Sequence, residues 1–175
     1  MESFITDKNN ENTKMAAQKF LQEFRKNEKN SIMFIGNNCT GKTHIATAIC
    51  NELMKDDIPV IFGTLSDIVN KYALSYQNNT SQELTTLYAQ VDLLVIDDLG
   101  VESINEWMLS KLFVIINERM NNELPIIITT NYDIEGLRNR LEISNDGCKT
   151  TDKIISRLCF ICRKVECKGD YYKNI

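Results

Sequence analysis

The sequence GNNCTGKT, residues 36–43, decides the fold of this chain. It matches the phosphate-binding pattern G-x-x-x-x-G-K-[S/T] at every fixed position. An apolar segment, SIMFI (31–35), precedes the motif, and a segment rich in Ala, Ile, Leu and Met (43–55) follows it. A strand that enters such a loop and a helix that leaves it are the context in which the pattern binds phosphate. We therefore prefer this interpretation to a chance glycine-rich turn.

The residue types of the motif suit a nucleoside triphosphate and its metal ion. Gly36 is expected to let the chain turn sharply, and Gly41 to let backbone N–H groups approach phosphate oxygens. Lys42 can reach the β- and γ-phosphates, and the hydroxyl of Thr43 can bind Mg²⁺. His44, the single histidine, is expected to have a packing or polar role rather than to act as a base. The residues expected to bind the nucleotide are Gly36, Asn37, Asn38, Cys39, Thr40, Gly41, Lys42, Thr43 and His44.

Further apolar segments indicate that the domain is built on a parallel sheet. VIF (60–62), VDLLVID (91–97) and IIITT (126–130) are continuously apolar, which is typical of strands covered on both faces. CFICRKVEC (159–167) is a fifth, weaker strand candidate because its polarity alternates. Helical patterns separate these segments, so the sequence predicts a three-layer α/β/α domain with right-handed crossovers.

The expected helices are bounded by polar residues that can cap them. Ser66 is a candidate cap, and Thr80–Glu83 and Ser103–Glu106 have the spacing of capping boxes. Apolar residues recur with helical spacing after Ser103, from Ile104 to Met120. The expected helices cover residues 12–26, 43–55, 66–76, 80–90 and 103–120.

Two adjacent carboxylates, Asp97 and Asp98, follow four apolar residues, Leu93 to Ile96, at the end of a predicted strand. Carboxylates at the end of a buried strand cost desolvation energy unless a cation is close. Asp97 is expected to hold Mg²⁺, and Asp98 to orient the attacking water. The alternative is that the pair caps the following turn. Asn131, which ends the next strand, could contact the γ-phosphate or the water, or could simply form a turn.

The overall charge argues against a broad nucleic-acid footprint. The formal net charge is −4, whereas proteins dedicated to binding nucleic acid are usually basic. Lys71, Lys111 and Arg119 are single charges on predicted helices, which we interpret as solvated helix faces. No apolar run approaches the ~20 residues of a membrane span, and the polar N-terminus has no signal-peptide core. The sequence therefore predicts a cytoplasmic protein without membrane contact.

The chain contains six cysteines, whose spacing does not suggest a disulfide framework. Cys159 and Cys162 form a lone C-x-x-C, which with Cys148 and Cys167 could supply four thiolates to zinc. Core packing is the preferred interpretation of these residues. Cys39 is expected to contribute its backbone to the phosphate loop, with a redox role as the alternative.

The combination of GNNCTGKTHIA, LLVIDDLG and TTN resembles the AAA+ ATPase domain of bacterial replicative helicase loaders of the DnaC/DnaI type. IstB-type transposition helper ATPases are similar. The resemblance extends from Phe4 to Lys173. It implies a P-loop NTPase fold with five parallel strands in the order 5-1-4-3-2 and two helices between the second and third strands. It also implies ATP or ADP and Mg²⁺ as cofactors.

The resemblance further implies a role for Arg157, in the segment TDKIISRLCF (151–160), as a finger that reaches the nucleotide of a neighbouring subunit. The alternative is a surface arginine at a helix end. Three features depart from the family. Asp98 stands where many AAA+ proteins carry glutamate, too few residues follow Arg157 for a full helical lid, and Lys173 occupies the place of a second arginine. Residues 1–175 are thus expected to form one AAA+ domain (1–30 an N-terminal segment and helix, 31–175 the core), without the loaders' N-terminal partner-binding domain.

The leading functional hypothesis is a slowly hydrolysing ATPase domain that loads the replicative helicase during DNA replication initiation. Its expected partners are the helicase, single-stranded DNA and further copies of the chain through Arg157. An IstB-type helper or another AAA+ initiator is the first alternative. A nucleotide-gated adaptor without turnover and a small P-loop kinase are the others. The catalytic residues expected from this hypothesis are Lys42, Asp98, Asn131 and Arg157, and the metal ligands are Thr43 and Asp97.

Overall fold

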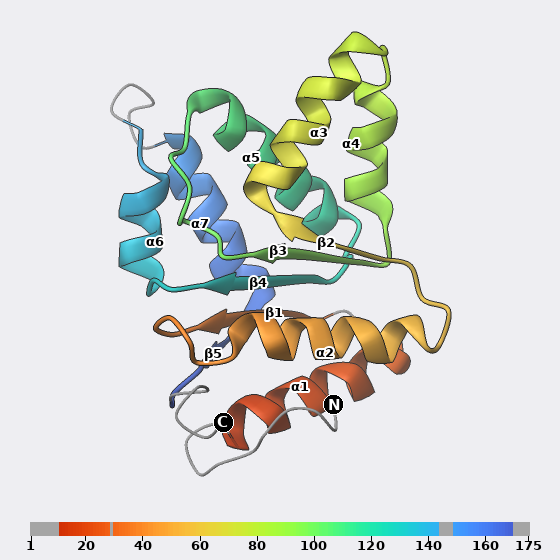
Figure 1. The fold of residues 1–175 in the computed structure, drawn as a ribbon, viewed down its shortest axis with the longest axis vertical. Coiled ribbons are helices and arrows are strands. Elements are labelled where there is room, and N and C mark those ends of the chain that lie inside the picture. Colours follow the sequence, from red (N-terminus) through yellow and green to blue (C-terminus); the bar gives the residue numbers. More distant parts are fainter. Residues whose placement is uncertain (1–10, 29, 144–148, 170–175) are drawn as a thin grey trace.

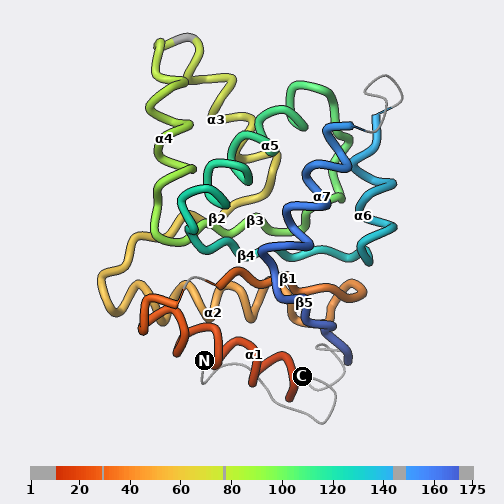
Figure 2. Tube along the Cα trace, turned by 180° about the vertical axis from the view of Figure 1, so that it is seen from behind, coloured from red at the N-terminus to blue at the C-terminus, as the bar shows by residue number. Residues whose placement is uncertain are grey.

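The computed structural model describes residues 11–28, 30–143 and 149–169. A central sheet separates two layers of helices, with α1 and α2 on one face and the other five helices on the opposite face (Figure 1). The view from behind shows the same division (Figure 2). The expected three-layer α/β/α domain is therefore confirmed.

All five strands of the sheet run parallel, in the order β2-β3-β4-β1-β5. This is the predicted order 5-1-4-3-2 read from the other edge. Because the strands are parallel, the ends of β1, β3 and β4 lie together at one edge of the sheet. The strands are β1 (Ser31–Ile35), β2 (Val60–Thr64), β3 (Leu93–Asp97), β4 (Ile126–Thr130) and β5 (Cys162–Glu166).

Seven helices occur in the described residues, and two of them connect β2 to β3 as the resemblance implied. The fifth predicted strand is shorter than expected, because Cys159 lies in the last turn of α7. Ile154, Ile155 and Leu158 are buried on that helix, and this apolar stripe keeps the chain helical until Ile161. The helices are α1 (Glu11–Arg25), α2 (Lys42–Met54), α3 (Leu65–Gln77), α4 (Ser81–Gln90), α5 (Glu106–Asn121), α6 (Ile134–Leu141) and α7 (Lys149–Ile161).

The cap predicted for α3 was displaced by two residues. Thr64, the last residue of β2, caps α3 in place of Ser66. Its hydroxyl accepts a hydrogen bond from the Asp67 backbone N–H, and the Asp67 carboxylate accepts one from the Thr64 N–H. This reciprocal pair is a capping box, so the strand passes into the helix without a loop.

The two other predicted capping boxes are wrong. Thr80 stands at the N-cap of α4, but its side chain makes no capping hydrogen bond. Helix α5 begins three residues later than Ser103, where the Asn105 side chain accepts a hydrogen bond from the Met108 N–H at 2.9 Å. Asparagine caps helices as well as serine does, so sequence spacing alone did not distinguish the two positions.

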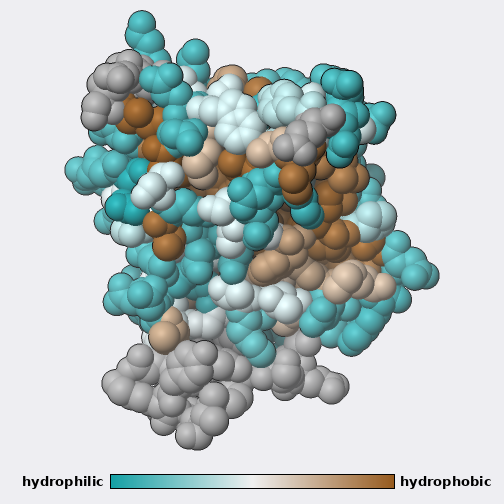
Figure 3. All heavy atoms as spheres, turned by 45° about the horizontal axis from the view of Figure 1, so that its top comes forward, coloured by the Kyte–Doolittle hydropathy of each residue, from teal (hydrophilic) through white to brown (hydrophobic). Residues whose placement is uncertain are grey.

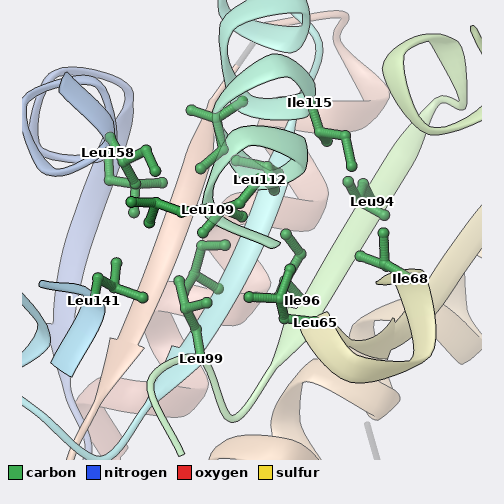
Figure 4. Close-up of a cluster of buried hydrophobic side chains, with 14 of the residues drawn as sticks. Leu65, Ile68, Leu94, Ile96, Leu99, Leu109, Leu112, Ile115, Leu141 and Leu158 are labelled. Carbon is green, nitrogen blue, oxygen red and sulfur yellow. The ribbon is translucent and has the colours of Figure 1, made fainter. Parts of the chain in front are cut away.

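Two hydrophobic cores lie on opposite faces of the sheet, because successive strand residues point in opposite directions. Ile126 and Ile128 of β4 pack under α3 to α7, whereas Ile127 between them packs against α1 and α2. The larger core joins five helices to the sheet, so it fixes the strand ends that carry the polar residues. Labelled members in Figure 4 are Leu65, Ile68, Leu94, Ile96, Leu99, Leu109, Leu112, Ile115, Leu141 and Leu158.

Arg119 lies inside the protein rather than on a solvated helix face, which corrects the sequence interpretation. Its side chain is fully buried. The guanidinium donates hydrogen bonds to the carbonyls of four residues, which lie at the end of α4, in the segment before β3 and just before β4. Burial lowers the pKa of Arg119 to about 10, so the group remains charged at neutral pH. The four acceptors are the carbonyls of Tyr88, Val91, Asp92 and Pro125.

The described cysteines do not converge on a metal site. Cys162 belongs to the larger core and Cys167 to the smaller one, on the other face of the sheet. Burial raises the pKa of Cys162 to about 12, so its thiol stays neutral. Cys148, the remaining zinc candidate, lies outside the described residues. These observations support the packing interpretation of Cys162 and Cys167.

Figure 3 shows a broad area of hydrophobic residues on the right of the view, bordered by hydrophilic residues. Leu74 of α3 and Leu87 of α4 are both more than half exposed. In the part of the chain that the structure describes, no helix has the length and apolarity that crossing a bilayer requires.

Candidate nucleotide-binding site

The loop between β1 and α2 has the conformation of an anion cradle. Cys39 and Gly41 adopt left-handed backbone conformations, with φ values of 64° and 84°. Helix α2 begins directly afterwards, and Gly41 at its N-cap supplies no side chain to bond the first N–H groups. These N–H groups and the positive end of the helix dipole therefore face the loop, as anion binding requires.

Gly36 is needed for a reason other than the expected turn. Its φ is not left-handed, but a Cβ at this position would overlap the backbone carbonyl oxygen of Cys167. The Cys167 N–H also donates a hydrogen bond to the Ile35 carbonyl at 2.7 Å. The chain after β5 thus passes against the start of the phosphate loop, and only glycine leaves room for it.

The Lys42 side chain lies within the loop and is only 5% exposed. Its Nζ donates a hydrogen bond to the Asn37 carbonyl oxygen at 2.8 Å, and the Thr40 hydroxyl donates to the same oxygen at 2.9 Å. Burial lowers the pKa of Lys42, and the nearby charges of Asp98 and Asp97 oppose that shift. The amine is thus held at the loop, close to both carboxylates.

Asp97 ends β3 beside the first turn of α2, which brings together the two residues expected to bind metal. The Thr43 hydroxyl lies 3.1 Å from Oδ1 and 3.0 Å from Oδ2 of Asp97 and donates to the carboxylate. Asp97 is only 7% exposed. A second hydroxyl, that of Thr129 in β4, donates to Oδ1 at 2.6 Å. The carboxylate is therefore fixed from two sides.

Asp98 lies at the turn that follows β3, with a left-handed φ of 52°. Aspartate and asparagine tolerate this conformation better than most other residues. Burial and the charge of Asp97 raise the pKa of Asp98, while Lys42 lowers it. A cation placed near these two carboxylates would relieve their repulsion, which fits the expected metal.

Asn131 follows the last residue of β4 and is brought to the same site. Its Oδ1 is buried and has no hydrogen-bond partner in the described structure. Buried polar atoms are rarely left unpaired in native proteins, so the unused acceptor indicates a missing water or ligand. Because an amide oxygen only accepts hydrogen bonds, this supports the expected contact with the water rather than one with a phosphate oxygen.

A cavity of about 420 Å³ lies at this site, and of the expected residues Gly36 and Asp97 do not line it. Asn37 and Thr40 do not line it, because they close the loop from behind through the hydrogen bonds to the Asn37 carbonyl. Thr47 lines it but was not expected. The signal was its position four residues after Thr43, which places both on one face of α2. The lining residues are Asn38, Cys39, Gly41, Lys42, Thr43, His44, Thr47, Asp98 and Asn131.

Arg157 lies on α7, outside the residues that line this cavity. Its Nε donates a hydrogen bond to Asn117 Oδ1 at 3.0 Å, and its guanidinium lies 4.8 Å from the centroid of the Phe113 ring. Both contacts come from α5. The side chain is half-buried and is held on the surface that α5 and α7 share, so it does not serve the nucleotide site of its own chain.

The residues present fit a nucleotide with Mg²⁺. The Thr43 hydroxyl and the Asp97 carboxylate are hard oxygen ligands of the kind Mg²⁺ prefers. Lys42 and the first N–H groups of α2 offer positive charge to phosphates. The unpaired Oδ1 of Asn131, which also lines the cavity, can accept a hydrogen bond from a water.

Comparison with known proteins agrees with this geometry. A family model described as "IstB-like ATP binding protein" matches residues 4–174. The replicative helicase loader DnaC of Escherichia coli K12 is 35% identical over 121 residues, which make up 68% of this chain and 49% of DnaC. This chain therefore spans about half the length of that relative.

Solved structures show the same fold. A crystal structure of the DnaC helicase loader has a TM-score of 0.81 at 22% identity, covering 95% of this chain and 94% of the other. The replication initiator DnaA, solved with AMPPCP and single-stranded DNA, has a TM-score of 0.80 at 27% identity. That match covers 97% of this chain and 49% of the DnaA chain. The similarity to the DnaC structure shows the fold alone. The DnaA structure is that of a protein bound to an ATP analogue.

Proposed function

Because this chain belongs to the family of IstB-like ATP-binding proteins, we propose that it is the slowly hydrolysing ATPase domain of a replicative helicase loader. It is an AAA+ P-loop domain of the helicase-loader kind. The single observation that carries the proposal is the contact of Thr43 with Asp97 beside the amine of Lys42. It joins the phosphate loop to the acidic end of a neighbouring strand, as a Mg²⁺-dependent nucleotide site requires.

Each residue of the site has a role that its position supports. Lys42 and the N–H groups at the start of α2 bind the phosphates, which requires Nζ to leave the Asn37 carbonyl for a phosphate oxygen. Thr43 and Asp97 hold Mg²⁺, which when bound offsets the phosphate charge. Asp98 orients the attacking water, and Asn131 contacts that water or the γ-phosphate. Aspartate is one CH₂ shorter than glutamate, so its weaker reach to the water supports slow hydrolysis.

Arg157 serves the nucleotide of a neighbouring subunit in this proposal. The support is its position outside its own cavity and its orientation by Phe113 and Asn117. An arginine that acts between subunits offsets the charge that develops on the transferred phosphoryl group. Hydrolysis would then depend on self-association of the chain.

The proposed partners are the replicative helicase and single-stranded DNA, in the bacterial cytoplasm. The relative at 35% identity is a helicase loader, and a structural neighbour was solved with single-stranded DNA. The net charge of −4 argues that DNA contact is local. An IstB-type transposition helper is the second candidate, because the matching family model carries that description. Pull-down of a hexameric helicase, compared with that of a transposase, distinguishes the two.

Two other functions have less support. A nucleotide-gated adaptor would bind ATP but show no turnover above background with DNA and the helicase present. A small P-loop kinase would transfer phosphate to an acceptor other than water. Such kinases close arginine-rich segments over the phosphates, and no arginine is among the described residues that line the cavity.

The first test is nucleotide binding by the Lys42→Ala variant, measured with a fluorescent ATP analogue and Mg²⁺. Loss of a charged donor to phosphate is expected to weaken binding by about 10- to 150-fold, from ~1.5–3 kcal/mol per charged hydrogen bond. Lys55→Ala is the matched control, because Lys55 follows the other end of α2, where it forms an exposed ion pair with Glu52 far from the phosphate loop. Equal affinity of wild type and Lys42→Ala would refute the site.

A further inference from the structure

We infer that Thr129 of β4 is a positioning residue that sets the metal-binding geometry of Asp97 and the turn at Asp98. The inference rests on the proposed function, since it concerns the same site. Thr129 is fully buried, so it touches neither nucleotide nor solvent and cannot itself be a ligand. Its role must be exerted through the two acidic residues.

One hydroxyl bonds two consecutive residues of β3 and its following turn. Thr129 Oγ1 donates to Asp97 Oδ1 at 2.6 Å and accepts a hydrogen bond from the Asp98 N–H at 2.8 Å. The backbone carbonyl of Thr129 also accepts from the Leu99 N–H at 2.8 Å. A single residue of the neighbouring strand therefore holds residues 97, 98 and 99 in sequence.

The chemistry of a hydroxyl explains why this arrangement is directional. Its single proton goes to Asp97, so only its lone pairs are available to the Asp98 N–H. The donated bond to Oδ1 fixes the plane of the carboxylate. Thr43 approaches the same carboxylate from the loop side, at both oxygens. The two threonines thus hold the Asp97 carboxylate in one orientation, between the sheet and the phosphate loop.

The second bond of Thr129 stabilises the conformation of Asp98. A left-handed backbone is costly for a residue other than glycine unless surrounding contacts hold it. The bond from the Asp98 N–H to Thr129 is such a contact. Groups behind a metal ligand that fix its orientation commonly change metal affinity by about 10- to 100-fold when removed. Thr129 is such a group, because it donates a hydrogen bond to the proposed metal ligand Asp97.

The test compares three variants of two neighbouring residues. Thr129→Val keeps the shape and removes both hydroxyl bonds, while Thr129→Ser keeps the hydroxyl. Thr130→Val is the matched control. Thr130 is also fully buried and its hydroxyl donates to the Leu99 carbonyl at 2.7 Å, but it touches neither carboxylate. All three variants therefore alter buried threonines at the end of the same strand, although Thr129 and Thr130 point to opposite faces of the sheet.

The readout is the Mg²⁺ concentration that gives half of the metal-dependent gain in affinity for a fluorescent ATP analogue. For Thr129→Val we expect a rise of about 10- to 100-fold, with the affinity in EDTA unchanged within about twofold. Thr129→Ser and Thr130→Val are expected to stay within about threefold of wild type. Thermal unfolding is followed in parallel, and if Thr129→Val does not fold, Thr129→Ala is measured in the same way.

Three results would overturn the inference. These are a Thr129→Val variant with wild-type Mg²⁺ dependence, an equal loss in Thr130→Val, or a Thr129→Ser variant as impaired as Thr129→Val. The proposed function fails in a different way. If the wild-type chain binds the analogue with no dependence on Mg²⁺, or not at all, then the site itself is wrongly assigned.

Discussion

Replacement of Arg119 by methionine is expected to be among the most destabilising single changes in this chain. Methionine has a similar length and an apolar end, so it fills the space without a donor. Arg119 joins the end of α4 and the segment before β3 to the residue before β4, through four backbone carbonyls. The substitution removes all four hydrogen bonds and introduces no residue that disfavours a helix.

The magnitude follows from which carbonyls become isolated. The bonds to Tyr88 and Pro125 are buried, whereas those to Val91 and Asp92 are part-buried, so water can replace the latter. An unpaired buried acceptor costs ~1–3 kcal/mol, which gives a loss of about 2–6 kcal/mol. For a chain of this length, each kcal/mol lowers Tm by about 2–4 °C, so Tm should fall by about 4–24 °C.

Urea and thermal unfolding of the metal-free chain measure this loss directly. Arg140→Met is the control, because Arg140 donates to the Gly100 and Val101 carbonyls in part-buried and exposed positions. Its loss should cost less than that of Arg119. Hydrogen exchange should show lower protection at the end of α4 in Arg119→Met. A variant with wild-type stability would refute the argument that these carbonyls depend on Arg119.

Two further predictions concern the site and its proposed neighbour. Burial and the charge of Asp97 raise the pKa of Asp98 above its ordinary value of 3.8. The folded chain therefore binds this proton more tightly than the unfolded chain does. Its stability falls as the pH rises from the unfolded pKa through the higher folded pKa. Asp98→Asn should therefore raise the Tm of the metal-free chain at pH 7, with the gain vanishing toward pH 4, and a gain independent of pH would contradict this. Arg157→Ala should bind ATP normally but lose about tenfold or more in turnover, and mixing it with Lys42→Ala should restore part of the rate. No recovery on mixing would argue against a finger that acts between subunits.

The sequence predicted the strands of the sheet well because the signals there are local and redundant, whereas the strand order came from the resemblance to a known family. The segments at 31–35, 93–97 and 126–130 are apolar throughout, and each was found within two residues of its expected limits. The phosphate loop and the following helix α2 were equally clear. At the helix starts, several polar residues lie close together, and only tertiary packing decides which one caps. Thr64 and Asn105 therefore replaced Ser66 and Ser103.

The roles of Arg119 and Thr129 could not be predicted from the sequence, because their hydrogen-bond partners come from other segments of the chain. Arg119 occurs in an amphipathic helix where a charged residue ordinarily faces solvent, and its acceptors come from segments 27 to 31 residues away and from Pro125. Thr129 belongs to the motif TTN, but nothing in the sequence distinguishes it from Thr130, whereas Asn131 is the polar residue that follows the strand. The significance of Thr129 comes from the register of β4 beside β3, which only the folded sheet provides.

The close passage of Cys167 over Gly36 would matter for coupling between subunits, if the chain self-associates through Arg157 as proposed. Helix α7, which carries Arg157, continues directly into β5, and β5 ends against the start of the phosphate loop. If Arg157 contacts a neighbouring subunit as proposed, a force on it would act on a short segment whose other end, at Cys167, lies against Gly36 at the start of the chain's own phosphate loop. In a ring or filament of such copies, nucleotide binding to one subunit would then shift the phosphate loop of the next subunit.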